Sequence, residues 1–128
     1  MMKAKNVLLI DDNEVDNYLT RHILLKNGVS ENIIVHSSGI DALKYLDDIR
    51  NETELMPDYI FLDIRMPEMD GFEFLDEFKL LPDAIKNKCI IFMLTSSGDQ
   101  KDVERAGQYS LVKRFLSKTL DGKILKDL

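Results

Sequence analysis

The chain has 128 residues, of which 45% are hydrophobic and 31% are charged, proportions that are usual for one soluble globular domain. Its 17 basic residues are outnumbered by 23 acidic ones, and the net charge of −6 at pH 7 argues against non-specific binding to nucleic acid or to an anionic membrane. No apolar run approaches the roughly 20 residues of a transmembrane helix, and the first residues lack the apolar segment of a signal peptide. We therefore expect a cytoplasmic protein, not inserted in a membrane, in which residues 1–128 form one domain.

Five strand-like segments alternate with helix-like segments along the chain. The strands are predicted at Val7–Ile10, Ile33–Val35, Tyr59–Leu62, Cys89–Leu94 and Leu111–Leu116. The helices are predicted at Val15–Lys26, Ile40–Arg50, from Gly71 to Pro82, Gln100–Ala106 and Asp121–Leu128. Strands that alternate with helices in so short a chain indicate βαβ units with right-handed crossovers and a parallel sheet, an α/β fold.

The apolar spacing also predicts which helix faces are buried. The stripes are Val15, Leu19 and Ile23 on the first helix, Leu43, Leu46 and Ile49 on the second, and Phe74, Phe78 and Leu81 on the third. The helix Gln100–Ala106 is mostly polar, so we expect it to be exposed and weakly anchored. The last strand contains Lys113 and Arg114, which is typical of a strand at the edge of a sheet.

Polar side chains stand where the predicted strands end. They are Asp11 and Asp12 after the first strand, Asp63 after the third, Thr95 and Ser96 after the fourth, and Ser117 and Lys118 after the fifth. The carboxyl ends of parallel strands share one edge of a sheet, where open α/β sheets bind ligands. Three carboxylates there favour a cation, and Mg²⁺ suits few protein ligands together with phosphate oxygens. Lys118 would supply a positive charge to the same phosphate.

Each of these residues has an ordinary structural explanation when it is considered alone. Asp11 and Asp12 are equally well read as caps of the first helix, Asp63 as a turn residue and Lys118 as a solvated lysine. All of these explanations would have to hold at the same sheet edge, which makes a functional site the better interpretation.

The set of residues resembles the receiver domain of bacterial two-component response regulators over the whole chain. The matching residues are Asp11, Asp12, Asp63, Met66-Pro67, Asp70-Gly71, Thr95 and Lys118, with Phe115 at the family's aromatic switch position. The resemblance implies a doubly wound, five-stranded parallel sheet with helices on both faces and the flavodoxin-like strand order 2-1-3-4-5.

The resemblance also implies a function. Asp63 would accept a phosphoryl group from the phosphohistidine of a histidine kinase or a histidine phosphotransfer protein. Mg²⁺ would be bound by Asp12, Asp63 and the backbone carbonyl of Arg65, with Asp11 acting largely through water. Thr95 would bond a phosphate oxygen and Lys118 would pair with the phosphate charge. Thr95 and Phe115 would then move and change the affinity for a downstream protein. The chain would be a phosphoacceptor and not an enzyme with a separate substrate, and a monomer or weak dimer.

Two features depart from the family pattern. Thr119 follows Lys118, where the family usually has a proline after a cis peptide, and the stretch between Ala106 and Phe115 is longer than usual. A cis bond before a non-proline residue costs roughly 2.5–4 kcal/mol, so we expect a trans Lys118–Thr119 bond. We also expect Arg65 and Ser97 to flank the path of a water that hydrolyses the acyl phosphate.

Three other functions fit parts of the pattern. A phosphatase of the haloacid dehalogenase type needs a second aspartate two residues after the nucleophile, where this chain has Arg65. A flavin-binding protein needs a hydroxyl- and glycine-rich phosphate loop after the first strand, where this chain is acidic. A pseudo-receiver that serves only as an interaction scaffold is the remaining alternative.

Overall fold

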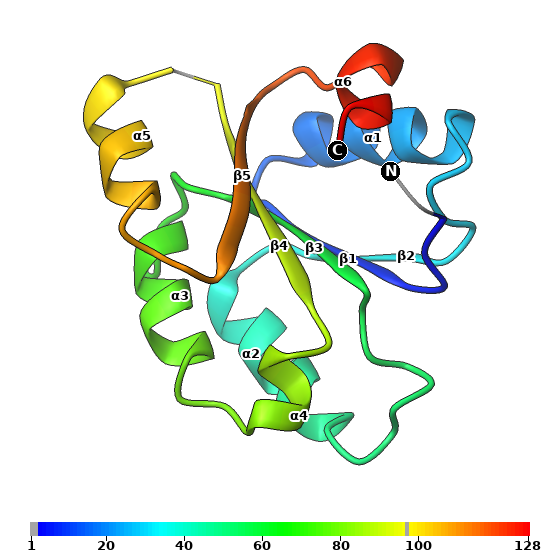
Figure 1. The fold of residues 1–128 in the computed structure, drawn as a ribbon, viewed down its shortest axis with the longest axis vertical. Coiled ribbons are helices and arrows are strands. Elements are labelled where there is room, and N and C mark those ends of the chain that lie inside the picture. The colour runs from blue at the N-terminus through cyan, green and yellow to red at the C-terminus, as the bar shows by residue number, and fades with distance from the viewer. Residues whose placement is uncertain (1–2, 97) are drawn as a thin grey trace.

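A single parallel sheet forms the centre of the computed structural model, which describes residues 3–96 and 98–128 (Figure 1). Its strands in this part of the chain are β1 (Val7–Ile10), β2 (Ile33–His36), β3 (Tyr59–Asp63), β4 (Ile90–Thr95) and β5 (Val112–Ser117). They lie in the order β2-β1-β3-β4-β5, which confirms the predicted fold and strand order.

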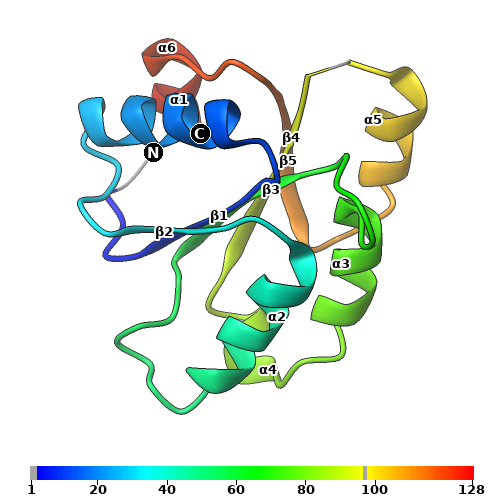
Figure 2. The same cartoon turned by 180° about the vertical axis from the view of Figure 1, so that it is seen from behind.

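Helices cover both faces of the sheet. They are α1 (Glu14–Lys26), α2 (Gly39–Asp48), α3 (Gly71–Phe78), α4 (Asp83–Lys86), α5 (Gln100–Ala106) and α6 (Gly122–Lys126). Figures 1 and 2 show α1 and α6 on one face and the other helices on the opposite face. The short α4 was not predicted: the sequence analysis extended one helix from Gly71 to Pro82, whereas α3 ends at Phe78 and α4 begins after Pro82.

Two apolar clusters, one on each face, hold the helices to the sheet. Leu8 and Ile10 of β1 belong to the cluster beneath α2 and α3, whereas Val7 and Leu9 belong to the cluster beneath α1 and α6. All four side chains are 0 or 1% exposed. The same alternation runs along β3, because successive side chains of a strand point to opposite faces. Burial on both faces explains why the strands read as unbroken apolar runs.

The inward face of α1 differs from the prediction. Val15 and Leu19 are 66% and 39% exposed, and the buried residues of this helix are Asn17, Thr20 and Leu24. The reason is that the first turns of α1 pack beside a polar sheet edge, where Asn17 Nδ2 donates a hydrogen bond to the carbonyl oxygen of Asp11 (2.7 Å). The predicted inward faces of α2 and α3 are confirmed, since their apolar residues pack in one cluster.

The polar helix α5 and the edge strand β5 are as predicted. In α5 the buried residues are Asp102 and Ala106, so the helix has little apolar contact with the sheet. Strand β5 pairs with β4 at the edge of the sheet. The connection between them packs against α3, because the hydroxyl of Tyr109 donates a hydrogen bond to Asp76 (3.0 Å). Within residues 3–96 and 98–128, no helix combines the length and the apolar character needed to cross a membrane.

Gly71 sets how closely the start of α3 approaches β3. Its N–H donates to the carbonyl oxygen of Ile64 (2.8 Å), and a Cβ at position 71 would lie 2.6 Å from the carbonyl oxygen of Asp63 and 3.0 Å from Cα of Ile64. A side chain here would therefore push α3 away from the strand that carries Asp63.

We predict that Gly71→Ala lowers the free energy of unfolding by about 1–3 kcal/mol, the usual cost of overpacking. Gly107→Ala is the matched control, since its Cβ would lie 3.4 Å from the nearest atom and its φ of −63° suits alanine. The control should be neutral or stabilising by up to about 1 kcal/mol. Chemical denaturation measures both, and equal stabilities of the two variants would contradict the prediction.

Candidate functional site

The acidic pair after β1 does not cap α1. Asn13 is the cap, because its Oδ1 accepts a hydrogen bond from the N–H of Asp16 (3.0 Å). Asp11 is 1% exposed, and its Oδ1 accepts a hydrogen bond from the N–H of Asn13 (3.0 Å). Asp12 is exposed. The turn into α1 thus buries one carboxylate of the pair and leaves the other open to solvent.

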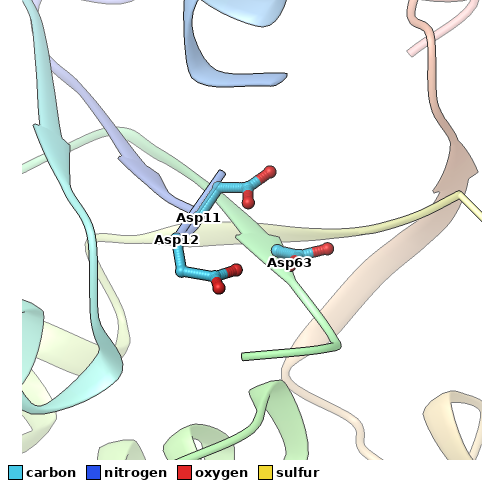
Figure 3. Close-up of side chains that lie close together, drawn as sticks. All are labelled: Asp11, Asp12 and Asp63. Carbon is cyan, nitrogen blue, oxygen red and sulfur yellow. The ribbon is translucent and has the colours of Figure 1, made fainter. Parts of the chain in front are cut away.

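Asp63 ends β3 and lies beside this pair. It is 5% exposed, and ligand oxygens of Asp11, Asp12 and Asp63 lie within 4.8 Å of one another. Figure 3 shows the three carboxylates projecting from the ends of β1 and β3 into the same space. Behind Asp63 the chain turns into α3, which Asp70 caps in a capping box with Glu73.

Lys118 reaches this group of acids from the end of β5. Its Nζ lies 2.6 Å from Asp11 Oδ2, 2.9 Å from Asp16 Oδ2 and 3.0 Å from Asp63 Oδ1. The lysine side chain is 9% exposed, so it is not a solvated surface lysine. The sequence analysis brought Asp11, Asp63 and Lys118 together, and the structure does so as well.

Asp16 is the site residue that the sequence analysis missed. It stands in the first turn of α1, its side chain is 33% exposed, and its carboxylate contacts Lys118. The available signal was its position one helical turn after Asp12, at the end of α1 that meets the sheet edge.

The Lys118–Thr119 peptide bond is cis, so the predicted trans bond was wrong. That prediction considered only the cost of an isolated non-proline bond. In the structure, the contacts of Lys118 also fix its position, because its N–H donates to the carbonyl oxygen of Thr95 (2.8 Å) while its ammonium group contacts three carboxylates.

Burial and neighbouring charges shift the pKa values of the two ionisable groups at the centre of the site, Asp63 and Lys118. Burial, with the neighbouring Asp11 carboxylate, raises the pKa of Asp63 to about 6 against the opposing effect of Lys118. For Lys118, burial alone would lower the pKa, but hydrogen bonds to Asp11 and Asp16 and the charge of Asp63 outweigh it and raise the pKa. At neutral pH Asp63 is therefore largely a carboxylate and Lys118 is an ammonium ion.

Of the two predicted switch residues, Thr95 lies at the same sheet edge as this group, where its carbonyl oxygen accepts a hydrogen bond from the N–H of Lys118, and Phe115 lies further back on β5. Thr95 ends β4 and is 2% exposed, and its register partner on β5 is Ser117. Phe115 is partly buried and packs against the cluster beneath α2 and α3.

The cleft at the strand ends has a volume of about 330 Å³ and is lined by Asp11, Asp12, Asn13, Asp16, Asp63, Arg65, Ser96 and Lys118.

Arg65 lines the cleft, but its guanidinium group points to α5. Its Nη2 lies 2.5 Å from Asp102 Oδ2 and 4.0 Å from Asp99 Oδ2. The arginine side chain is 62% exposed, whereas that of Asp102 is 9% exposed. Ser97, the other residue expected near the path of the hydrolytic water, lies outside the described residues.

The donor set of the cleft fits a hard divalent cation. The contacts described above use neither the carboxylate of Asp12 nor Oδ2 of Asp63, so carboxylate oxygens remain for a metal ion. Four carboxylates (Asp11, Asp12, Asp16 and Asp63) line the cleft together with the Lys118 ammonium group, and the guanidinium group of Arg65 is paired with Asp102, which leaves an excess of negative charge. Mg²⁺ and similar ions prefer such oxygen ligands.

Comparison with known proteins agrees with this geometry. A family model described as the response regulator receiver domain matches residues 7–128. Response regulator Rcp1 of Synechocystis sp. is 31% identical over 126 residues, which are 97% of this chain and 81% of that protein. Histidine kinase CKI1 of Arabidopsis thaliana is 29% identical over 94% of this chain, but the match spans only 11% of the kinase.

Solved structures show the same similarity. A two-component response regulator from Cytophaga hutchinsonii has a TM-score of 0.90 and 33% identity, and the match covers 98% of this chain and 94% of that one. The Mn²⁺-bound form of response regulator Rcp1 has a TM-score of 0.73 and 28% identity, with coverage of 96% and 87%.

The perturbed pKa of Asp63 predicts a stabilising substitution. The folded state holds the Asp63 proton up to pH about 6, whereas an unfolded chain releases it near 3.8. The contribution of Asp63 to stability therefore falls as the pH rises between these values. In metal-free buffer at pH 7, Asp63→Asn should raise the free energy of unfolding by about 1–3 kcal/mol, and the gain should vanish toward pH 4.

Asp58→Asn is the matched control. Burial alone would raise the pKa of Asp58, but hydrogen bonds from Lys88 and from the N–H groups of Asn6 and Lys5 outweigh it and lower the pKa. This variant should lose stability at pH 7 and approach the wild type in acid. Denaturation curves from pH 8 down to below 3.8, the ordinary pKa of this carboxyl, test both signs, and an Asp63→Asn variant less stable than the wild type at pH 7 would refute the prediction.

Proposed function

This chain belongs to the response regulator receiver family, a family of signalling domains in two-component systems, and we propose that the chain is a phosphoacceptor whose phosphorylation site is Asp63. The donor would be the phosphohistidine of a histidine kinase or a histidine phosphotransfer protein. The observation that carries the proposal is the Lys118 ammonium group 3.0 Å from Asp63 Oδ1, at a sheet edge shared with two further carboxylates.

The proposed reaction is a phosphoryl transfer. A carboxylate oxygen of Asp63 attacks phosphorus, the phosphorus–nitrogen bond of the phosphohistidine breaks, and the electron pair stays on the imidazole nitrogen. The product is an acyl phosphate on Asp63 and a histidine side chain that takes up a proton as needed. Such transfers depend mainly on position and on stabilisation of charge. Lys118 would neutralise part of the phosphoryl charge, and the hydroxyl of Thr95 would bond a phosphate oxygen.

Mg²⁺ would be held by Asp12, Asp63 and the backbone carbonyl of Arg65, with Asp11 acting largely through water. When bound, the ion would offset the negative charge of the phosphoryl oxygens. The carboxylate oxygens of Asp11, Asp12 and Asp63, which lie within 4.8 Å of one another, support this assignment. The related response regulator Rcp1, whose solved structure is of a Mn²⁺-bound form, supports it as well.

Phosphorylation would change the affinity for a downstream protein. In this proposal Thr95 moves toward the phosphoryl group and Phe115 turns inward, and the shift is passed to β5 and α5. The modest anchoring of α5, with Asp102 and Ala106 as its buried residues, supports a role for that helix in the response. A pseudo-receiver would keep the fold but would not accept a phosphoryl group, so phosphorylation separates the two functions.

We predict that the wild type gains one phosphate when it is incubated with Mg²⁺ and a small acyl phosphate, and that Asp63→Asn gains none. Intact-mass spectrometry measures the change. Asp58→Asn is the control, since Asp58 precedes β3 while Asp63 ends it, and this variant should be labelled like the wild type. Labelling of Asp63→Asn, or no labelling of the wild type, would overturn the proposal.

Substitution of Asp12 should weaken Mg²⁺ binding and leave the rest of the site intact. Asp12→Ala should weaken Mg²⁺ binding by tenfold or more, on the order of the loss of one of few protein ligands, and should slow phosphorylation accordingly. Because Asp12 is exposed, its loss should leave the thermal stability in metal-free buffer nearly unchanged. Calorimetric titration with Mg²⁺ and the labelling rate test this. Normal labelling of Asp12→Ala in the presence of a metal chelator would show that the metal assignment is wrong.

A further inference from the structure

The ammonium group of Lys118 is shared among three carboxylates: it donates hydrogen bonds to Asp11 and Asp16 and forms an ion pair with Asp63. A lysine ammonium carries three N–H groups, and Nζ contacts three carboxylates, those of Asp11, Asp16 and Asp63, at 2.6–3.0 Å. A phosphoryl oxygen on Asp63 can therefore be bound by Lys118 only if one of the existing contacts is exchanged or shared.

The three carboxylates differ in how easily they can release the lysine. Asp11 is 1% exposed, makes the shortest contact, and is held in place by the N–H of Asn13. Asp63 is the phosphoacceptor itself in the proposed function. Asp16 is 33% exposed and contacts Lys118 at 2.9 Å, so water can replace the lysine around its carboxylate at little cost.

We propose that Asp16 is a positioning residue that holds Lys118 toward α1 and competes with the phosphoryl group for it. The inference rests on the proposed function, since it concerns the same lysine. The carboxylate of Asp16 opposes phosphorylation because it occupies one N–H donor of Lys118. Asp16 thereby sets how strongly this domain retains a phosphoryl group.

Beryllium trifluoride, a phosphoryl mimic, tests the inference on the full chain at saturating Mg²⁺. Asp16→Asn should tighten its binding by about 2- to 5-fold, the upper part of the range expected from one partly exposed charge pair. Asp16→Glu, which keeps the charge, should bind within about twofold of the wild type. Glu14→Gln removes an exposed charge from the same helical turn and should also change the affinity by less than about twofold.

A double-mutant cycle with Lys118→Ala separates action through the lysine from a general charge effect. The gain from Asp16→Asn should be largely lost in the Lys118→Ala background if Asp16 acts through Lys118. An equal gain in both backgrounds, or unchanged or weaker binding by Asp16→Asn, would overturn the inference while the proposed function stands. Failure of the wild type to bind the mimic would overturn both.

Discussion

The contact between the Lys118 ammonium group and the carboxylates of Asp11, Asp16 and Asp63 is the interaction on which this sheet edge depends. Carboxylates this close and this buried repel one another and resist ionisation, so they coexist only with a nearby cation. The cation is delivered from β5, while the acids come from β1, α1 and β3. The group therefore joins the edge strand to the centre of the sheet, and the same charges that connect these elements are those that the proposed phosphoryl transfer would use.

The scaffold places these groups by simple geometry. Strands buried on both faces are apolar until their last residue, and the carboxyl ends of β1, β3, β4 and β5 then present polar side chains along one line. The close approach of Gly71 to Asp63 fixes the path that the chain takes away from this line. Packing on the two faces thus determines where the strand ends, and therefore the charged side chains, lie. The loops after the strands determine how those side chains are oriented.

Much of this arrangement follows from the sequence because apolar runs and topology determine it. The parallel sheet and the convergence of Asp11, Asp12, Asp63 and Lys118 required only the order of strands and helices. Asp16 was missed because α1 buries Asn17 and Thr20 near the site, so that apolar periodicity selected the wrong face of the helix. The four residues of α4 are too few to show a helical period of apolar residues. The cis bond between Lys118 and Thr119 was not predicted because it depends on contacts that form only in the folded chain.

The pairing of Arg65 with Asp102 joins two segments that are 37 residues apart. The guanidinium group follows the end of β3 by two residues, and the carboxylate is one of the buried groups of α5. The free energy of local opening of α5 therefore includes a contribution from a residue that belongs to the loop after Asp63. If the guanidinium group of Arg65 moved away, the Asp102 carboxylate would be left buried without a partner. Helix α5 would then relieve this by turning the carboxylate toward water. Amide hydrogen exchange along α5 should therefore become faster when the pairing of Arg65 with Asp102 is lost.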